Sequence, residues 1–167
     1  MDLADPADII DKAAGLNPAT GVGTLRRERP EILRLSQASY RAALHPADPG
    51  NLSYVERAAL ACRMVRLLKD DTLAAHYAGL LDGEGAGSAT ATLVDPSITN
   101  AVDARTNAIL RHVDLLTLSP EKATRGDVER LMSAGLTDRD VVTLTGLIAF
   151  VNYQARLVVG MRMLKGE

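Results

Sequence analysis

The fold of this chain is decided by residues 53–81, which read SYVERAALACRMVRLLKDDTLAAHYAGLL. Ser53 and Glu56 have the Ser-x-x-Glu spacing of a capping box, in which the hydroxyl and the carboxylate satisfy free backbone donors at a helix start. Apolar residues then recur at helical spacing as far as Leu68. This part of the stretch predicts a helix from Ser53 to about Leu68.

The break after that helix is the short segment 69–72, which reads KDDT. Asp70 or Asp71 caps the next helix and puts negative charge where the helix dipole favours it. The second helix runs from Thr72 to about Leu81 and carries His76. The stretch therefore predicts a helical hairpin, and a reactive centre, if the protein has one, is expected there.

Two residues of the hairpin belong to types that carry chemistry. Cys62 lies on the apolar side of the first helix, which favours a small core residue over a thiol nucleophile. Helical spacing puts Thr72, His76 and Leu80 along one side of the second helix. Gly79 leaves space near the imidazole ring. These positions allow a pocket beside His76.

The composition indicates one α-helical domain. The chain has 167 residues, of which 47% are hydrophobic and 24% charged, so a single domain over residues 1–167 with a real core is expected. Aromatic residues make up only 3%, and Trp is absent, so Leu, Val, Ile, Ala and Met must build the core. These residues suit helices. We therefore predict an all-α fold.

Charge and cysteine content exclude several classes of protein. The net charge of −2 gives no footprint for a nucleic acid backbone. With one Cys, no intramolecular disulfide can form, and no Cys/His cluster has the spacing of a zinc site. The glycines at 21–23 and 83–87 lack the nucleotide-binding pattern. The acidic start is unlike a signal peptide, and the run 141–155 is too short to span a bilayer. We expect a cytoplasmic protein without metal, cofactor, nucleic acid or membrane.

Further start and stop signals give about seven helices in all. Residues 1–29 hold a first helix and a connector, and residues 82–97 read as a flexible loop. The helices expected outside the hairpin are Pro6–Leu16, Pro30–Leu44, Ser97–Leu118, a short helix between Thr124 and Gly135, and Asp138 to about Leu164.

Apolar residues cover most of the circumference of the last predicted helix, so it must be buried nearly all round. Either the other helices wrap it or a second subunit covers it, and homo-oligomerisation follows as an inference. Asn152, Gln154 and Arg156 interrupt the apolar surface and need polar partners. They are candidates for a site, and a structural hydrogen-bond network is the alternative.

Several segments together resemble the alkylhydroperoxidase D and carboxymuconolactone decarboxylase superfamily. The likeness covers roughly residues 32–164 and depends on the order and spacing of the segments. They are LSYVERAALA at 52–61, LAAHY at 73–77, LLTLSP at 115–120, AGLTDRD at 134–140 and, resembling the peroxidase-related branch, AFVNY at 149–153.

The resemblance implies an all-α bundle around a central helical hairpin, assembled into dimers, trimers or hexamers. It also implies a Cys-x-x-Cys-x-x-x-His motif at the start of the second hairpin helix, with a glutamate on the first helix completing a proton relay. Anchored on His76, the two cysteine positions fall on Lys69 and Thr72, and neither forms a thiolate. Counting back from His76 by the interval of the family reaches Arg57, and matching the first helix by its own pattern reaches Ala58. Glu56 therefore corresponds to the glutamate only if the break carries an extra residue.

Three functions remain to be weighed. The first is a thiol-independent enzyme acting on a small molecule, with His76 as general acid or base and Glu56 as its catalytic partner. Its substrate pocket would draw on Thr72, Asn152, Tyr153 and Arg156. The second is a non-catalytic oligomeric protein that binds a ligand or acts as a scaffold. The third, a peroxidase-related antioxidant protein, is disfavoured because a dithiol cycle needs two cysteines.

Overall fold

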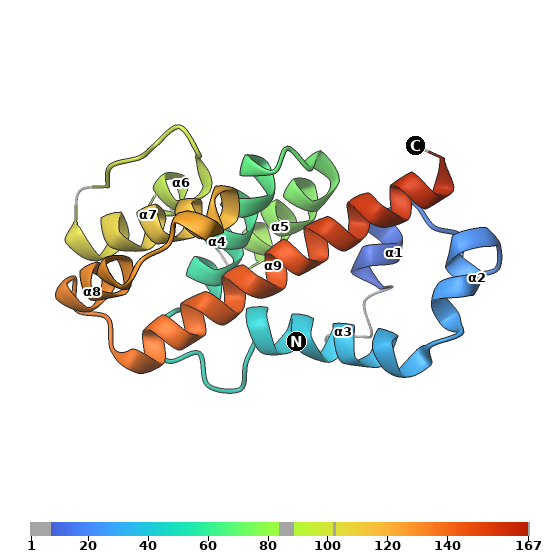
Figure 1. The fold of residues 1–167 in the computed structure, drawn as a ribbon, viewed down its shortest axis with the longest axis horizontal. Coiled ribbons are helices and arrows are strands. Elements are labelled where there is room, and N and C mark those ends of the chain that lie inside the picture. The colour runs from blue at the N-terminus through green and yellow to red at the C-terminus, as the bar shows by residue number, and fades with distance from the viewer. Residues whose placement is uncertain (1–7, 84–88, 102, 167) are drawn as a thin grey trace.

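The protein is an all-α bundle, as the sequence predicts. The structure is a computed structural model that describes residues 8–83, 89–101 and 103–166. Within these ranges it has nine α-helices and one 3₁₀ helix (Figure 1). They are α1 (Ile9–Ala13), α2 (Gly21–Arg27), α3 (Pro30–Leu44), α4 (Tyr54–Leu67), α5 (Asp71–Gly83), α6 (Ala89–Val94), α7 (Ala104–Leu118), η1 (Pro120–Lys122), α8 (Arg125–Ser133) and α9 (Asp138–Lys165).

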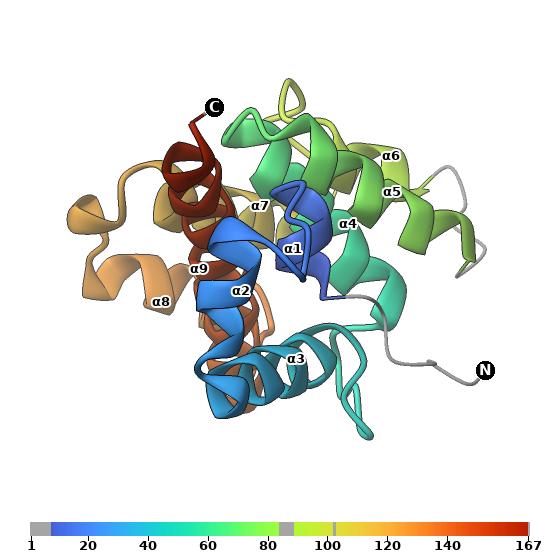
Figure 2. The ribbon, with the colours of Figure 1, turned by 90° about the vertical axis from the view of Figure 1, so that its right-hand side faces the viewer.

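The α4–α5 hairpin forms the centre of the core. Ser53 and Glu56 make the predicted capping box at the start of α4. Along α4, every residue from Arg57 to Val65 is buried. In Figure 1, α9 crosses the whole molecule, with α3 on one side and the hairpin and α7 on the other. Figure 2 shows α1 between α2 and the hairpin.

A buried arginine ties α4 to α7. The side chain of Arg63 is fully buried and forms a two-point ion pair with Asp114, with both N···O distances at 2.6 Å. Its guanidinium also donates to the carbonyl oxygens of Asp95 and Ile98. The ion pair and these two bonds compensate a charge that would otherwise be costly in the core. Arg63 thereby holds the segment before α7 against α4.

Asp70 joins three parts of the fold at the hairpin turn. Its Oδ1 atom accepts a hydrogen bond from the Leu73 backbone N–H, so Asp70 is the residue that caps α5. The carboxylate also pairs with the Arg162 guanidinium of α9, at 2.9 and 3.2 Å. Arg162 in turn donates to the Ala13 carbonyl oxygen at the end of α1. One carboxylate therefore links the hairpin, α9 and, through Arg162, α1.

Several predicted boundaries differ from the structure. The first helix covers only Ile9–Ala13, the predicted connector contains α2, and the predicted loop 82–97 contains α6. Residues 84–88 of that loop lie outside the described residues. The helix predicted to start at Ser97 starts at Ala104, because Asp95 holds Ser97 in a turn and Asp103 caps α7. These local side-chain bonds compete with helix continuation.

Helix α9 has the predicted bounds, but the other helices of the chain do not cover it all round, so the first of the two predicted ways of burying it is not met. Val142, Met163 and Leu164 are about 70% exposed, at 73%, 71% and 70%. Among the described residues, α9 is the one helix long and apolar enough to cross a membrane, with a mean hydropathy of 1.4. Half of that apolar window is buried inside the protein, which accounts for the apolar composition on that side of the helix.

We predict that Asp70→Ala lowers the free energy of unfolding by about 3 kcal/mol, because it removes the α5 cap and leaves the Arg162 charge without its partner. Urea unfolding followed by circular dichroism measures the loss. Asp48→Ala is the matched control, since Asp48 pairs with Arg139 in the open, at 68% and 66% side-chain exposure. The control is expected to change stability much less, because exposed ion pairs contribute little. Equal losses in the two variants would contradict the role of Asp70.

Candidate functional site

His76 of α5 is held by a tyrosine from α3. The Nε2 atom of His76 lies 2.9 Å from the Tyr40 hydroxyl oxygen, within hydrogen-bond distance. Tyr40 reaches this position because Ser36, Tyr40 and Leu44 follow each other at four-residue spacing and form the buried line of α3. The bond fixes the imidazole on the side of α5 that faces α1 and α3.

A cavity of about 240 Å³ lies beside the His76 ring. Helix α1 forms one wall with Ile9, Lys12 and Ala13, and α5 forms the other with Thr72, Ala75 and His76. The walls combine apolar side chains with a hydroxyl, an imidazole and an ammonium group. The predicted placement of Thr72 and His76 on one side of a pocket agrees with this geometry.

Burial keeps the His76–Tyr40 pair uncharged near neutral pH. It lowers the pKa of His76 to about 4, and the positive charge of Lys12 acts in the same direction. Burial likewise raises the pKa of Tyr40 to about 12. The pair can therefore offer hydrogen bonds to a ligand, and it places no formal charge in the cavity.

The neighbouring residue on α5 anchors the site to α9. Tyr77 is fully buried, and its hydroxyl donates to the Gln154 Oε1 atom at 2.5 Å. Burial also raises the pKa of Tyr77, so the hydroxyl remains a donor. The rings of His76 and Tyr77 meet edge to face, with their centroids 5.1 Å apart. Gln154 thus has the structural partner that its position in the apolar helix requires.

The structure places Glu56 in a different environment from His76. One carboxylate oxygen accepts from the backbone N–H and the hydroxyl of Ser53, and the other pairs with Arg105 at 2.6 Å. Among the described residues these are the polar contacts of Glu56. These contacts explain the Glu56 carboxylate as part of the α4 cap and as a link to Arg105 of α7.

Three further candidates from α9 lie outside the His76 cavity. Asn152 is buried, donates to the Ile148 carbonyl oxygen and accepts from Arg156 at 2.7 Å. Arg156 is exposed and lines a separate pocket of about 210 Å³. Tyr153 lines a groove between α3 and α9 and lies within hydrogen-bond distance of the Ser36 hydroxyl, at 2.9 Å. Among the described residues, those that line the His76 cavity come from α1 and α5.

The hairpin turn has its own backbone geometry. Lys69 has a φ of 59°, in the left-handed region. Its N–H bonds to the Arg66 carbonyl oxygen, and the Asp70 N–H bonds to that of Val65. These two bonds close α4 in a Schellman motif, whose left-handed position usually belongs to glycine. Thr72 follows in the first turn of α5.

Cys62 is fully buried in the hairpin, with its Sγ atom 3.7 Å from the Ala74 carbonyl oxygen. Burial raises its pKa, which opposes thiolate formation. This agrees with the prediction that Cys62 is a core residue. In the described part of the chain, no group of three or more His, Cys, Asp or Glu side chains could hold a metal ion.

Sequence reasoning missed two residues of this site, Tyr40 and Lys12. A signal existed for Tyr40, since it lies four residues from both Ser36 and Leu44. The sequence also places apolar residues on another side of α3, at Ile32 and Leu35, but these are 49% and 48% exposed. For Lys12 no local signal exists, because its position depends on how α1 packs against the hairpin.

Comparison with solved structures identifies the fold. A peroxidase-related protein from Silicibacter sp. TM1040 superposes with a TM-score of 0.68 at 22% identity, over 78% of this chain and 68% of that one. An alkylhydroperoxidase AhpD core, peroxidase-related protein from Ralstonia eutropha JMP134 gives 0.67 at 20% identity, over 94% and 85%. The chain has the AhpD-like fold. No protein-family model matches the sequence, and no curated protein matches it significantly.

The AhpD-like fold confirms the predicted fold and the structural side of the resemblance. Both comparison structures share the helical architecture, but their sequence identities with this chain are near 20%. The likeness therefore concerns the fold alone. The chemistry of this chain has to be argued from its own residues, above all from the cavity beside His76.

We predict that His76 makes stability depend on pH. Its pKa is about 4 in the folded protein and about 6.5 unfolded, so the unfolded state binds more protons between these values. The wild-type protein therefore loses stability as pH falls from about 6.5 towards 4. Relative to His76→Gln, which cannot titrate there, the extra loss between pH 7.5 and pH 5 is about 1–2 kcal/mol. Urea unfolding at both pH values measures it.

The comparison with His76→Gln cancels the contributions of His45 and His112, which both proteins retain. Identical pH dependence in the two proteins would contradict the burial of His76. An NMR titration of the His76 ring protons provides a direct check, because the folded protein should show little change above about pH 5.

Proposed function

We propose that the cavity beside His76 binds a small molecule without thiol chemistry. The observation that carries this proposal is the imidazole ring that lines an open cavity of about 240 Å³ while Tyr40 holds it in place. The neutral ring and the Thr72 hydroxyl supply hydrogen bonds, and Ile9 and Ala13 supply apolar contact. A few polar groups in a mostly apolar concave wall are typical of small-molecule sites.

Acid–base catalysis on the bound molecule is the second candidate function. The Tyr40 hydrogen bond favours it, because a base needs a partner that fixes its ring. A pKa of about 4 makes His76 a weak base at neutral pH. An anionic substrate beside Lys12 would offset the positive charge that contributes to this low value, and would strengthen the base.

A dithiol peroxidase cycle finds no support in the residues of this chain. Both comparison structures are of peroxidase-related proteins. Here Lys69 and Thr72 stand at the positions of the two thiols, and Cys62 is buried in the other hairpin helix. A dithiol cycle needs two cysteines within reach of each other.

Self-association is the second part of the proposal. Large apolar side chains are exposed along α9, and they include Val159, Met163 and Leu164. Further ones lie on α2 and α3, at Leu25 and Ile32. Exposed apolar side chains support this proposal, because apolar surface gains stability when a partner removes it from water. A second copy of the chain covering the C-terminal part of α9 would remove it from water.

The cavity proposal is tested with the ¹⁵N-labelled protein and a library of small cyclic compounds. We expect binders that shift the backbone signals of Thr72 and His76. Ala75→Leu should weaken them at least about tenfold, because the larger side chain fills the cavity. Ala104→Leu, at an exposed position of α7, is the control and should leave binding unchanged.

The result that contradicts the cavity proposal is equally specific. Binders whose affinity is unaffected by both Ala75→Leu and His76→Ala would bind elsewhere. A large loss of thermal stability in His76→Ala, with no compound found that shifts Thr72, would support a purely structural histidine.

Light scattering tests self-association. The wild-type protein should give a mass of at least two chains, and Met163→Glu should lower the association constant about tenfold or more, because it buries a charge in the interface. Met132→Glu, at a 46% exposed methionine of α8, is the matched control. A monodisperse monomer of the wild-type protein would refute the proposal.

A further inference from the structure

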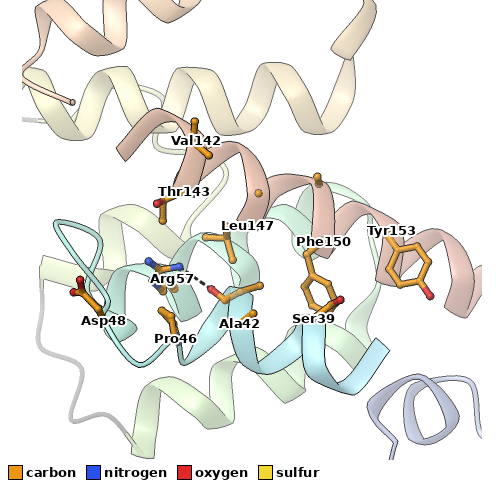
Figure 3. Close-up of a pocket in the computed structure, with 13 residues that line it drawn as sticks. Ser39, Ala42, Pro46, Asp48, Arg57, Val142, Thr143, Leu147, Phe150 and Tyr153 are labelled. Carbon is orange, nitrogen blue, oxygen red and sulfur yellow. Dashed lines mark hydrogen bonds between the residues drawn. The ribbon is translucent and has the colours of Figure 1, made fainter. Parts of the chain in front are cut away.

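A second and larger concave site lies between α3 and α9. This groove has a volume of about 630 Å³ and is distinct from the His76 cavity (Figure 3). Figure 3 shows Asp48 at one end of the labelled residues, with Arg57 and Pro46 next to it, and Tyr153 at the other end. Ala42, Leu147 and Phe150 form the apolar wall between these ends. The volume falls in the range of small-molecule sites.

Arg57 is the unusual residue of this groove. It is only 3% exposed, and its hydrogen bonds all go to main-chain carbonyl oxygens, those of Leu52, Ala43 and Pro49, at 2.8 to 2.9 Å. A guanidinium has five N–H groups, so two of them have no acceptor among the described residues. Burial lowers the pKa of Arg57 and so disfavours its charge, while the nearby Tyr54 and Glu56 act in the opposite direction.

The nearby carboxylates are already engaged. Asp48 lines the groove but pairs with Arg139 at 2.6 Å. Glu56, the next residue along the chain, pairs with Arg105. Within the described residues, the buried Arg57 charge therefore has no carboxylate of its own. Arg63, the other arginine buried in α4, contrasts with it because Arg63 has Asp114.

We propose that the groove binds a small organic acid, with its carboxylate at Arg57 and its apolar body along the α3–α9 wall towards Phe150. A carboxylate bound at Arg57 would accept hydrogen bonds from the guanidinium N–H groups that the three carbonyl oxygens leave unused, and it would supply a counter-charge. Thr143 also lines the groove and carries a hydroxyl that could contribute a further hydrogen bond to the ligand. The apolar residues of the wall then match the hydrocarbon part of the ligand.

Titration calorimetry with hexanoate tests this site, with hexanamide as the uncharged probe of the same shape. Hexanoate should bind at least about tenfold more tightly, since hydrogen bonds to a charged group contribute more than neutral ones. Equal affinity for the two probes, or no binding of hexanoate, would overturn the proposal.

A glycine of α9 offers a variant that leaves Arg57 intact. Gly146 lines the groove, and a Cβ atom added there meets nothing within 4 Å. Gly146→Leu should therefore fold, and it should weaken hexanoate binding at least tenfold by filling the groove. Gly160 has the same open surroundings in α9 but does not line the groove, so Gly160→Leu is the matched control and should bind as the wild type does.

Two further measurements separate this proposal from the others. His76→Gln should leave hexanoate binding unchanged, and weaker binding in that variant together with full binding in Gly146→Leu would place the acid in the other cavity and overturn the proposal. If wild-type protein ignores hexanoate while Gly146→Leu changes the mass seen by light scattering, a second copy of the chain occupies the groove instead.

Discussion

The ion pair between Asp70 and Arg162 is the interaction on which the arrangement of the site depends. Asp70 starts α5, the helix that carries His76, and Arg162 holds the end of α1 through the Ala13 carbonyl oxygen. The two walls of the His76 cavity are thus tied to one carboxylate. Because the Asp70 side chain is only 4% exposed, water screens this pair little.

The sequence predicted best what local chemistry determines. The capping box at Ser53 and the helix cap at Asp70 can each be recognised from a few neighbouring residues in the sequence, and together they predict the hairpin. The partners of buried polar groups could not be predicted in this way. Arg63 finds Asp114 at a separation of 51 residues, and Tyr40 finds His76 at 36. Such pairs form only when helices that are distant in the sequence pack together, and no short stretch of sequence specifies that packing.

The exposure of α9 shows the same limit. Its sequence is apolar on most sides, yet one chain provides enough neighbours to cover only about half of its most apolar window. The apolar surface of α9 that the other helices leave exposed is available for contact with another molecule. The α3–α9 groove lies along this helix and contains the buried guanidinium of Arg57. In this protein the AhpD-like fold thus combines a cavity beside a neutral imidazole with a groove that contains a buried guanidinium.

The left-handed backbone of Lys69 bears on any attempt to restore dithiol chemistry. The first of the two thiol positions that the resemblance assigns falls on this residue, one step before Asp70 and outside α5. A cysteine placed there would inherit the conformation that the Schellman motif imposes, and it would not share the helix N-terminus that lowers a thiol pKa. Cysteines exchanged for Lys69 and Thr72 would therefore place one thiol in the left-handed turn and the other in the first turn of α5.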